Sequence, residues 1–304
     1  MITINGIRIA GLSGIYKNQD HYKGHYEIPP FNTHTQHSVY HVRNLEIHRL
    51  SQIKMPIDIM LTHDWPTGIT NYGNCNELLR IKPYFEEEIQ NNSLGSPENE
   101  KLLKILKPKY WFAAHLHVKF AALYKHNDNI NQTKFLSLDK CLPRRKFLQL
   151  IDIQTTVSDN KLCLDPEWLL ILKKSDSWLN ISSYMQAPLN EKLTITKEEI
   201  DDLLEDFESN LTIPNNFRVT APAHQPNSDT PNLDIKDVYL NDQTTLLCEM
   251  LNIRDPVRVL LERTGRSTII SESKTELYNN LLDEDDDDDD EEEESEGKEK
   301  EKKE

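Results

Sequence analysis

Two apolar segments of this chain end in histidines, and this pattern most restricts how the chain can fold. Residues 57–61 read Ile-Asp-Ile-Met-Leu and lead to His63, and residues 110–114 read Tyr-Trp-Phe-Ala-Ala and lead to His115 and His117. Short apolar runs of this kind are typical of buried strands. Because open α/β sheets bind ligands beyond the carboxyl ends of their strands, the sequence predicts an α/β fold with histidines at the functional edge.

These histidines are candidate metal ligands. If the backbone stays extended from His115 to His117, both imidazoles leave the same face of the strand. With His63 they would supply three imidazoles, a set that suits zinc or iron-type metals; the alternative is a group of ordinary surface or core histidines. Three are too few for a two-metal phosphodiesterase, whose ions lie about 3.5–4 Å apart and share a carboxylate. Asp64 is interpreted as a helix cap or turn residue.

A long segment, residues 17–36, lacks hydrophobic periodicity. Loops of about 20 residues in a compact domain are usually functional or disordered, and disordered segments are poor in aromatic residues. This segment and its neighbour Tyr16 are rich in aromatic and basic side chains, namely Tyr16, Tyr22, Tyr26, Phe31, Lys17, Lys23, His21 and His25. We therefore interpret it as a functional loop.

The remaining patterns divide the chain into an α/β part, residues 1–153, a mostly helical part, residues 158–255, and a disordered end, residues 256–304. The first part is expected to contain a hairpin over residues 1–16 with its turn at Asn5-Gly6, helices at 39–53, 74–90 and 98–106, and strands at 57–61, 110–115, 119–124, 134–138 and 147–153. The second part is expected to contain helices at 165–174, 196–209 and 242–252. Residues 283–304 contain 16 acidic residues and four lysines, which indicates a disordered acidic tail.

Charge and cysteine usage narrow the class of protein. Residues 1–150 contain 19 basic and 13 acidic residues, although the whole chain has a net charge of −16. A mildly basic, histidine-rich half suits a polyanionic substrate. The four cysteines are scattered without a Cys-x-x-Cys pair, which fits a reducing compartment. No apolar run reaches the roughly 18–20 residues of a membrane helix, and the N-terminus has no signal-peptide pattern, so the expected location is the cytosol or nucleus.

Several motifs occur in order along the chain. They lie at residues 11–16, 22–27, 40–44, 62–66, 92–97, 110–123 and 138–143. The longest reads Tyr-Trp-Phe-Ala-Ala-His-Leu-His-Val-Lys-Phe-Ala-Ala-Leu. Through these motifs, residues 6–255 resemble the RNA lariat debranching enzymes, a family of the calcineurin-like metallophosphoesterase superfamily.

The resemblance implies a fold, an activity and a site. The fold would be the C-terminal part of a metallophosphoesterase αββα sandwich, followed by a mostly helical C-terminal domain. The activity would be hydrolysis of the 2′–5′ phosphodiester at the branch point of intron lariats, with a divalent metal (Fe²⁺, Zn²⁺ or Mn²⁺) on His63, His115 and His117. A lariat recognition loop would span residues 13–43, with substrate-binding residues Ser13, Gly14, Tyr16, Lys17, Tyr22, Lys23, His25 and Arg43.

The resemblance also implies a cellular role. It places the protein in mRNA processing and RNA splicing in the nucleus, with the cytoplasm as a second location. Branched RNA would be the partner, and neither a membrane nor a dinucleotide cofactor is expected.

The sequence departs from the family in one respect. Family members begin with a further segment that carries Cys-x-His, Gly-Asp and Gly-Asn-His-Glu motifs, which supply the remaining ligands and the proton donor. This sequence starts after those motifs, so the catalytic residues stay unassigned. Our hypothesis is a truncated copy or incomplete gene model that binds metal weakly and cleaves little on its own. The alternatives are a general metallophosphoesterase and a non-catalytic RNA-binding remnant.

Overall fold

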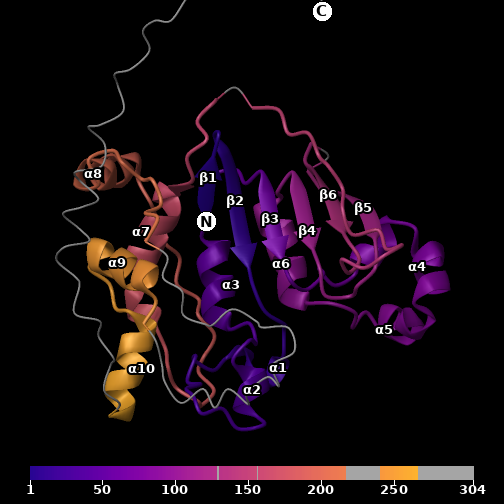
Figure 1. Ribbon diagram of the computed structural model, residues 1–304, viewed down its shortest axis with the longest axis horizontal. Coiled ribbons are helices and arrows are strands. Elements are labelled where there is room, and N and C mark those ends of the chain that lie inside the picture. Colours follow the sequence, from indigo (N-terminus) through magenta and orange to yellow (C-terminus); the bar gives the residue numbers. More distant parts are fainter. Residues whose placement is uncertain (129, 156, 217–239, 266–304) are drawn as a thin grey trace, which may run out of the picture. The chain divides into compact units, whose positions relative to one another are not determined.

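The computed structural model describes residues 1–128, 130–155, 157–216 and 240–265. Within them, a mixed sheet of seven strands runs from residue 2 to residue 164 of the chain (Figure 1). The strand order is β5-β6-β4-β3-β2-β1-β7. Strands β2, β3, β4 and β6 are parallel, whereas β1, β5 and β7 are antiparallel to their neighbours. The strands are β1 (Ile2–Ile4), β2 (Ile7–Leu12), β3 (Ile59–Thr62), β4 (Tyr110–Ala113), β5 (Phe120–Lys125), β6 (Gln132–Ser137) and β7 (Cys163–Leu164). The predicted α/β class is confirmed.

Each segment predicted to be helical contains at least one helix, but the helix expected at 74–90 is divided at Pro83, and helices Asn18–His21, Thr35–Ser38 and Pro256–Thr264 were not predicted. The helices are α1 (Asn18–His21), α2 (Thr35–Ser38), α3 (Asn44–Ser51), α4 (Cys75–Ile81), α5 (Glu86–Gln90), α6 (Pro97–Leu106), α7 (Pro166–Lys174), α8 (Lys197–Asp206), α9 (Asp242–Leu251) and α10 (Pro256–Thr264), with short 3₁₀ helices at Ile69–Tyr72, Pro83–Phe85 and Asp176–Trp178. Within the described ranges, no helix combines the length and apolar content needed to cross a membrane.

The β1–β2 hairpin forms where the sequence predicts it. Asn5 and Gly6 have φ values of +50° and +74°, and two successive positive φ angles are the requirement of a type I′ turn, which Asn-Gly meets at low cost. Strand β2 pairs with β3 in parallel, with Leu12 opposite Thr62. The loop after β2 and His63 after β3 therefore begin at the same edge of the sheet.

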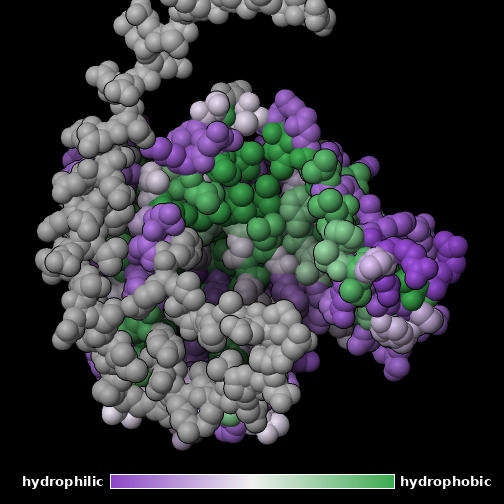
Figure 2. Space-filling view, in the orientation of Figure 1, coloured by the Kyte–Doolittle hydropathy of each residue, from purple (hydrophilic) through white to green (hydrophobic). Residues whose placement is uncertain are grey.

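The two faces of the sheet differ in burial. One face packs its side chains into the main core against α3 and α6; its strand residues include Ala10, Met60, Trp111 and Phe135. On the opposite face, Leu61 is 45% exposed and Leu123 is 41% exposed. Figure 2 shows a mainly apolar surface over the strands on this open face.

Residues 147–153 do not form the predicted strand. Instead, Gln149, Leu150 and Ile151 line a hollow together with side chains of β4, β5 and β6, among them Phe112 and Leu136. Most of the segment is exposed, with Leu148 at 73% and Leu150 at 92%, so its apolar residues are not buried as those of a core strand would be.

Two helix predictions also need correction. The helix expected at 39–53 begins only at Asn44, because Val42 donates its backbone N–H to the Ile15 carbonyl and so holds the preceding residues against the loop. Part of the end expected to be disordered, residues 256–304, forms α10, which Asp255 caps by accepting hydrogen bonds from the backbone N–H groups of Val257 and Arg258. The acidic tail, residues 283–304, lies outside the described residues.

A smaller core joins α7, α8 and α9 through Leu169, Leu170, Leu203, Phe207 and Leu251. A buried ion cluster ties α7 to the sheet: the Arg8 guanidinium on β2 donates to Asp165 at 2.7 and 2.9 Å and to Glu167 at 2.8 Å. Breaking a buried pair leaves an uncompensated charge, so this cluster fixes the helical part against β2.

Candidate functional site at the ends of β3 and β4

The carboxyl ends of β3 and β4 lie side by side, because the two strands are parallel neighbours with Leu61 opposite Phe112. His63 follows β3 and His115 follows β4. The turns after the strands are joined directly: Ala114 donates its N–H to the His63 carbonyl at 3.1 Å, and the Trp65 indole donates to the Ala114 carbonyl at 2.9 Å. The sequence prediction that these histidines share one edge is borne out by this geometry.

The imidazoles of His63 and His115 stack, with ring centroids 4.7 Å apart and planes 21° from parallel. Burial lowers the pKa of His63, and the nearby His115 ring lowers it further. The pKa of His115 is raised, chiefly by its hydrogen bond to the Asp64 carboxylate. The two rings therefore prefer different protonation states, which allows them to stack without two full positive charges in contact.

His117 does not join this pair in the way predicted. The expectation of two side chains on one strand face assumed an extended backbone, but His115 and His117 have φ values of +55° and +50° and follow the end of β4. His117 is exposed, and the charged side chains that act on its ring include Lys82 and Lys140. The left-handed backbone turns its side chain out of the predicted register.

The loop that follows β2 reaches the same edge. Residues Gly11–Ile15 line an open pocket of about 810 Å³ with His63, Tyr40, Leu61 and Thr62. Ser13 and Gly14 are thus beside His63. Gly14 has a φ of +100°, and an added Cβ would lie 2.4 Å from the Tyr40 carbonyl oxygen, so this turn requires glycine.

Known proteins align with most of the chain. Residues 130–256 match the family model described as "Lariat debranching enzyme, C-terminal domain". Lariat debranching enzymes of Danio rerio and Homo sapiens are each 44% identical over 278 residues, covering 88% and 87% of this chain and 49% and 51% of their own lengths. The Arabidopsis thaliana lariat debranching enzyme is 39% identical over 284 residues, covering 92% of this chain and 67% of the relative.

The chain belongs to the lariat debranching enzyme family. It spans about half the length of the Danio rerio and Homo sapiens relatives. The match to the C-terminal domain model begins at residue 130, within the segment that leads into β6, and the domain boundary predicted at residue 158 stays a prediction.

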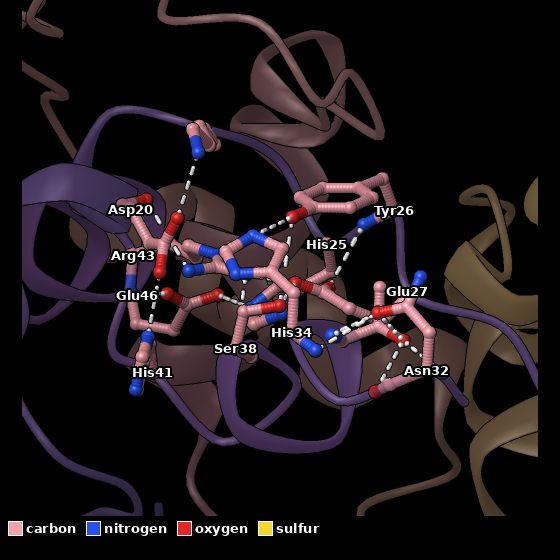
Figure 3. A network of polar contacts seen from close by, with 12 residues as sticks. Asp20, His25, Tyr26, Glu27, Asn32, His34, Ser38, His41, Arg43 and Glu46 are labelled. Atoms are coloured by element: carbon pink, nitrogen blue, oxygen red, sulfur yellow. Dashed lines mark hydrogen bonds and ion pairs between the residues drawn. The ribbon is translucent and has the colours of Figure 1, made fainter.

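Residues 13–43, the predicted recognition loop, contain short helices and a network of polar contacts (Figure 3). Arg43 lies at its centre and is 1% exposed. Its guanidinium donates to Glu27 at 2.6 Å and to the carbonyls of Ser38 and Asp20 at 3.0 and 3.3 Å. Arg43 therefore holds the loop together from inside, and this position does not suit the predicted contact with RNA.

Other predicted loop residues are also engaged. Lys23 and His41 donate to Asp20 at 2.8 and 2.7 Å; burial opposes ionisation of Asp20, but these hydrogen bonds lower its pKa overall. His25 contacts Glu46 at 2.9 Å. The side chains of Ser13 and Lys17 are exposed, and those of Tyr16 and Tyr22 are half-buried, so these four keep surface for a substrate.

Sequence reasoning missed Asp20, Glu27 and Asp64 as organising residues. A signal for the first two existed: they are the two acidic residues of segment 13–43, which is otherwise neutral or basic. Isolated carboxylates in such a loop are natural partners for its cations, and both are buried here.

The imidazoles of His63 and His115 match part of the ligand set that a divalent metal needs. Nδ1 of His115 faces Asp64, which leaves Nε2 of His115 free as a ligand, and His63 stands beside it. Supporting carboxylates of this kind are typical of metal-binding histidines. However, no group of three or more His, Cys, Asp or Glu side chains suited to a metal occurs among the described residues. His63 and His115 are therefore the two predicted ligands that this structure brings together, and a metal-binding role for them and for His117 stays a prediction.

Proposed function

We propose that this chain takes part in RNA lariat debranching, the hydrolysis of the 2′–5′ phosphodiester at the branch point of an excised intron. In this reaction water adds to the branch phosphorus and the 2′ oxygen leaves with a proton, which yields a linear RNA with a 5′ phosphate. The observation that carries the proposal is that His63 lines the same pocket as Ser13, Gly14 and Tyr40, so that the recognition loop and the histidine pair share one site.

The loop offers the surface that branched RNA requires. Unpaired bases are recognised by stacking on aromatic rings and by phosphate contacts from cations. Tyr40 is 43% exposed, Tyr16 is half-buried and Lys17 is exposed, all within the recognition loop. We propose that these three side chains contact the nucleotides around the branch, while the buried Arg43 keeps the loop in shape.

His63 and His115 would hold a divalent metal, Fe²⁺, Zn²⁺ or Mn²⁺. Such a metal supplies Lewis-acid stabilisation of the charge that develops on phosphate oxygens. Asp64 orients the His115 ring, and the turns after β3 and β4 hold both imidazoles at the pocket wall. We further propose a role in mRNA processing and splicing in the nucleus, because the family's substrate is the excised intron.

The selectivity for the 2′–5′ over the 3′–5′ phosphodiester linkage tests this function more sharply than the absolute rate of cleavage. The whole chain would be incubated with Mn²⁺, Zn²⁺ or Fe²⁺ and a branched RNA, with a linear RNA of the same composition, and with a small aryl phosphate. We expect the cleavage to be slow and confined to the 2′–5′ linkage, with the 3′–5′ linkages left intact.

The other outcomes identify the alternatives. Equal hydrolysis of linear RNA or of the aryl phosphate would indicate a general metallophosphoesterase. Binding of branched RNA that is unchanged by His63→Ala and His115→Ala, without any metal-dependent cleavage, would indicate a non-catalytic RNA-binding protein.

A further inference from the structure

Asp64 lies between the histidine pair and the first residues of the recognition loop, and it contacts both. The residue is 5% exposed. Its Oδ1 lies within hydrogen-bond distance of Nδ1 of His115, and its Oδ2 accepts a hydrogen bond from the backbone N–H of Tyr16 at 2.9 Å. One carboxylate therefore connects the segments that follow β2 and β4.

The backbone of Asp64 is itself fixed. Its carbonyl accepts hydrogen bonds from the Thr62 hydroxyl at 2.7 Å and from the Asn99 side chain at 2.9 Å. The Thr62 hydroxyl in turn accepts from the Trp111 indole at 2.9 Å. Because Thr62 and Trp111 lie in neighbouring strands, hydrogen bonds from the sheet and from α6 fix the backbone that carries the carboxylate.

We propose that Asp64 is a positioning residue that fixes the tautomer of His115 and at the same time anchors the start of the recognition loop to the histidine pair. This rests on the proposed function for the use of the site, but the two contacts exist without substrate. The expectation from sequence that Asp64 caps a helix or turn is thereby replaced by a bridge between two segments of the site.

The chemistry of the two contacts leaves one arrangement. An ionised carboxylate accepts hydrogen bonds and donates none. The ring must therefore carry its proton on Nδ1 when it faces Asp64, which leaves the lone pair of Nε2 directed away and available to a ligand. The second oxygen is free for Tyr16, so both demands are met together.

Asp64→Asn removes this double acceptor at nearly constant size. In place of the two carboxylate oxygens, an amide has one oxygen and one NH₂ group, so it has an acceptor at the Tyr16 position or at the His115 position but not at both. If the oxygen stays with Tyr16, the NH₂ group faces His115, and the ring must move its proton to Nε2. Nε2 would then lose the lone pair that a metal needs.

The matched control is Asp58→Asn. Asp58 precedes β3, whereas Asp64 follows it, and its carboxylate also bridges a backbone N–H and a side chain: Arg8 N–H at 3.0 Å and Lys109 Nζ at 2.7 Å. This variant loses a comparable pair of contacts at the far end of the same strand. It should leave His115 and Tyr16 unaffected.

The first test is ¹⁵N NMR of the whole chain without RNA or metal, at a pH where the imidazoles are neutral. In the unsubstituted chain we expect His115 to carry its proton on Nδ1, and a predominantly Nε2-protonated ring would overturn the proposal. This measurement stands even if Asp64→Asn does not fold or if the chain does not debranch RNA.

The second test uses the variants. In Asp64→Asn we expect either a switch of His115 to the Nε2-protonated tautomer or faster hydrogen exchange of the Tyr16 amide, and neither in Asp58→Asn. By calorimetric titration, Asp64→Asn should lower the affinity for Mn²⁺ by about 10–100-fold, as loss of a supporting carboxylate does elsewhere. Unchanged tautomer, exchange rate and affinity, or the same losses in Asp58→Asn, would overturn the proposal.

Discussion

Replacement of Arg43 by methionine tests whether the recognition loop depends on a buried ion pair. Arg43 and Glu27 each have a side chain that is 1% exposed, and their charged groups are 2.6 Å apart. Methionine retains much of the apolar length of arginine but removes the charge. The Glu27 carboxylate would then keep the Ser38 hydroxyl at 2.6 Å and the Tyr26 N–H at 3.1 Å as hydrogen-bond donors, without a counter-charge.

The expected cost follows from these contacts. Removal of one partner of a buried ion pair costs about 3–5 kcal/mol. The two remaining donors partly compensate the carboxylate, and the carbonyls of Asp20 and Ser38 still accept backbone hydrogen bonds from Lys23 and His41. We therefore expect Arg43→Met to destabilise the loop by about 3 kcal/mol, the lower end of that range.

Urea unfolding and hydrogen exchange of the loop amides would measure this cost. Arg145→Met is the matched control, because Arg145 pairs with Asp139 at 3.2 Å with its side chain 50% exposed. Surface pairs contribute about 0–1 kcal/mol. The combined variant Arg43→Met with Glu27→Gln should cost less than the sum of the two single variants, since it leaves no buried charge. A cost of Arg43→Met below about 1 kcal/mol, equal to that of Arg145→Met, would refute this account.

Three further outcomes are expected. Gly14→Ala should destabilise the chain by more than about 1 kcal/mol, because φ is +100° and the added Cβ would lie 2.4 Å from a backbone carbonyl oxygen; full stability in a thermal melt would contradict this. Burial raises the pKa of the Cys248 thiol to about 11, so Cys248 should react with iodoacetamide far more slowly than the exposed Cys141 in a mass-spectrometric time course. In an NMR titration His115 should have a higher pKa than His63. A pKa of His63 above that of His115 would show that the Asp64 contact is absent in solution. Because folding raises the pKa of His115, the stability that protonated His115 contributes should be complete below its ordinary pKa of about 6.5. This stability should be lost as the pH rises through the folded-state pKa of His115.

Local patterns predicted the β1–β2 hairpin and the positions of strands β3, β4, β5 and β6 along the chain. The Asn5-Gly6 turn has a specific backbone requirement, and the runs before His63 and His115 are short and strongly apolar. These signals depend on residues close together in the chain, so the sequence contains what is needed to interpret them. The convergence of His63 and His115 then followed from the parallel arrangement of their strands.

The features that the sequence did not predict depend on contacts between residues far apart in the chain or on unexpected backbone angles. The burial of Arg43 depends on Glu27, 16 residues away, and on a loop fold that has no periodicity. His117 could not be placed because the extended backbone was assumed, whereas the chain adopts positive φ angles at both histidines. The strand expected at 147–153 had the apolar residues of a strand, but the structure leaves most of them exposed, Leu150 at 92%, and the segment is not part of the described sheet.

The most direct test of the central claim is the ratio of the dissociation constants of a linear and a branched RNA, measured on the whole chain at one ionic strength. Phosphate contacts alone bind both RNAs alike and depend on salt, whereas a site that joins the recognition loop to the histidine pair reads the branch. We predict that the branched RNA binds at least about ten-fold more tightly, which corresponds to about 1.4 kcal/mol. Equal affinities for the two RNAs would contradict the account.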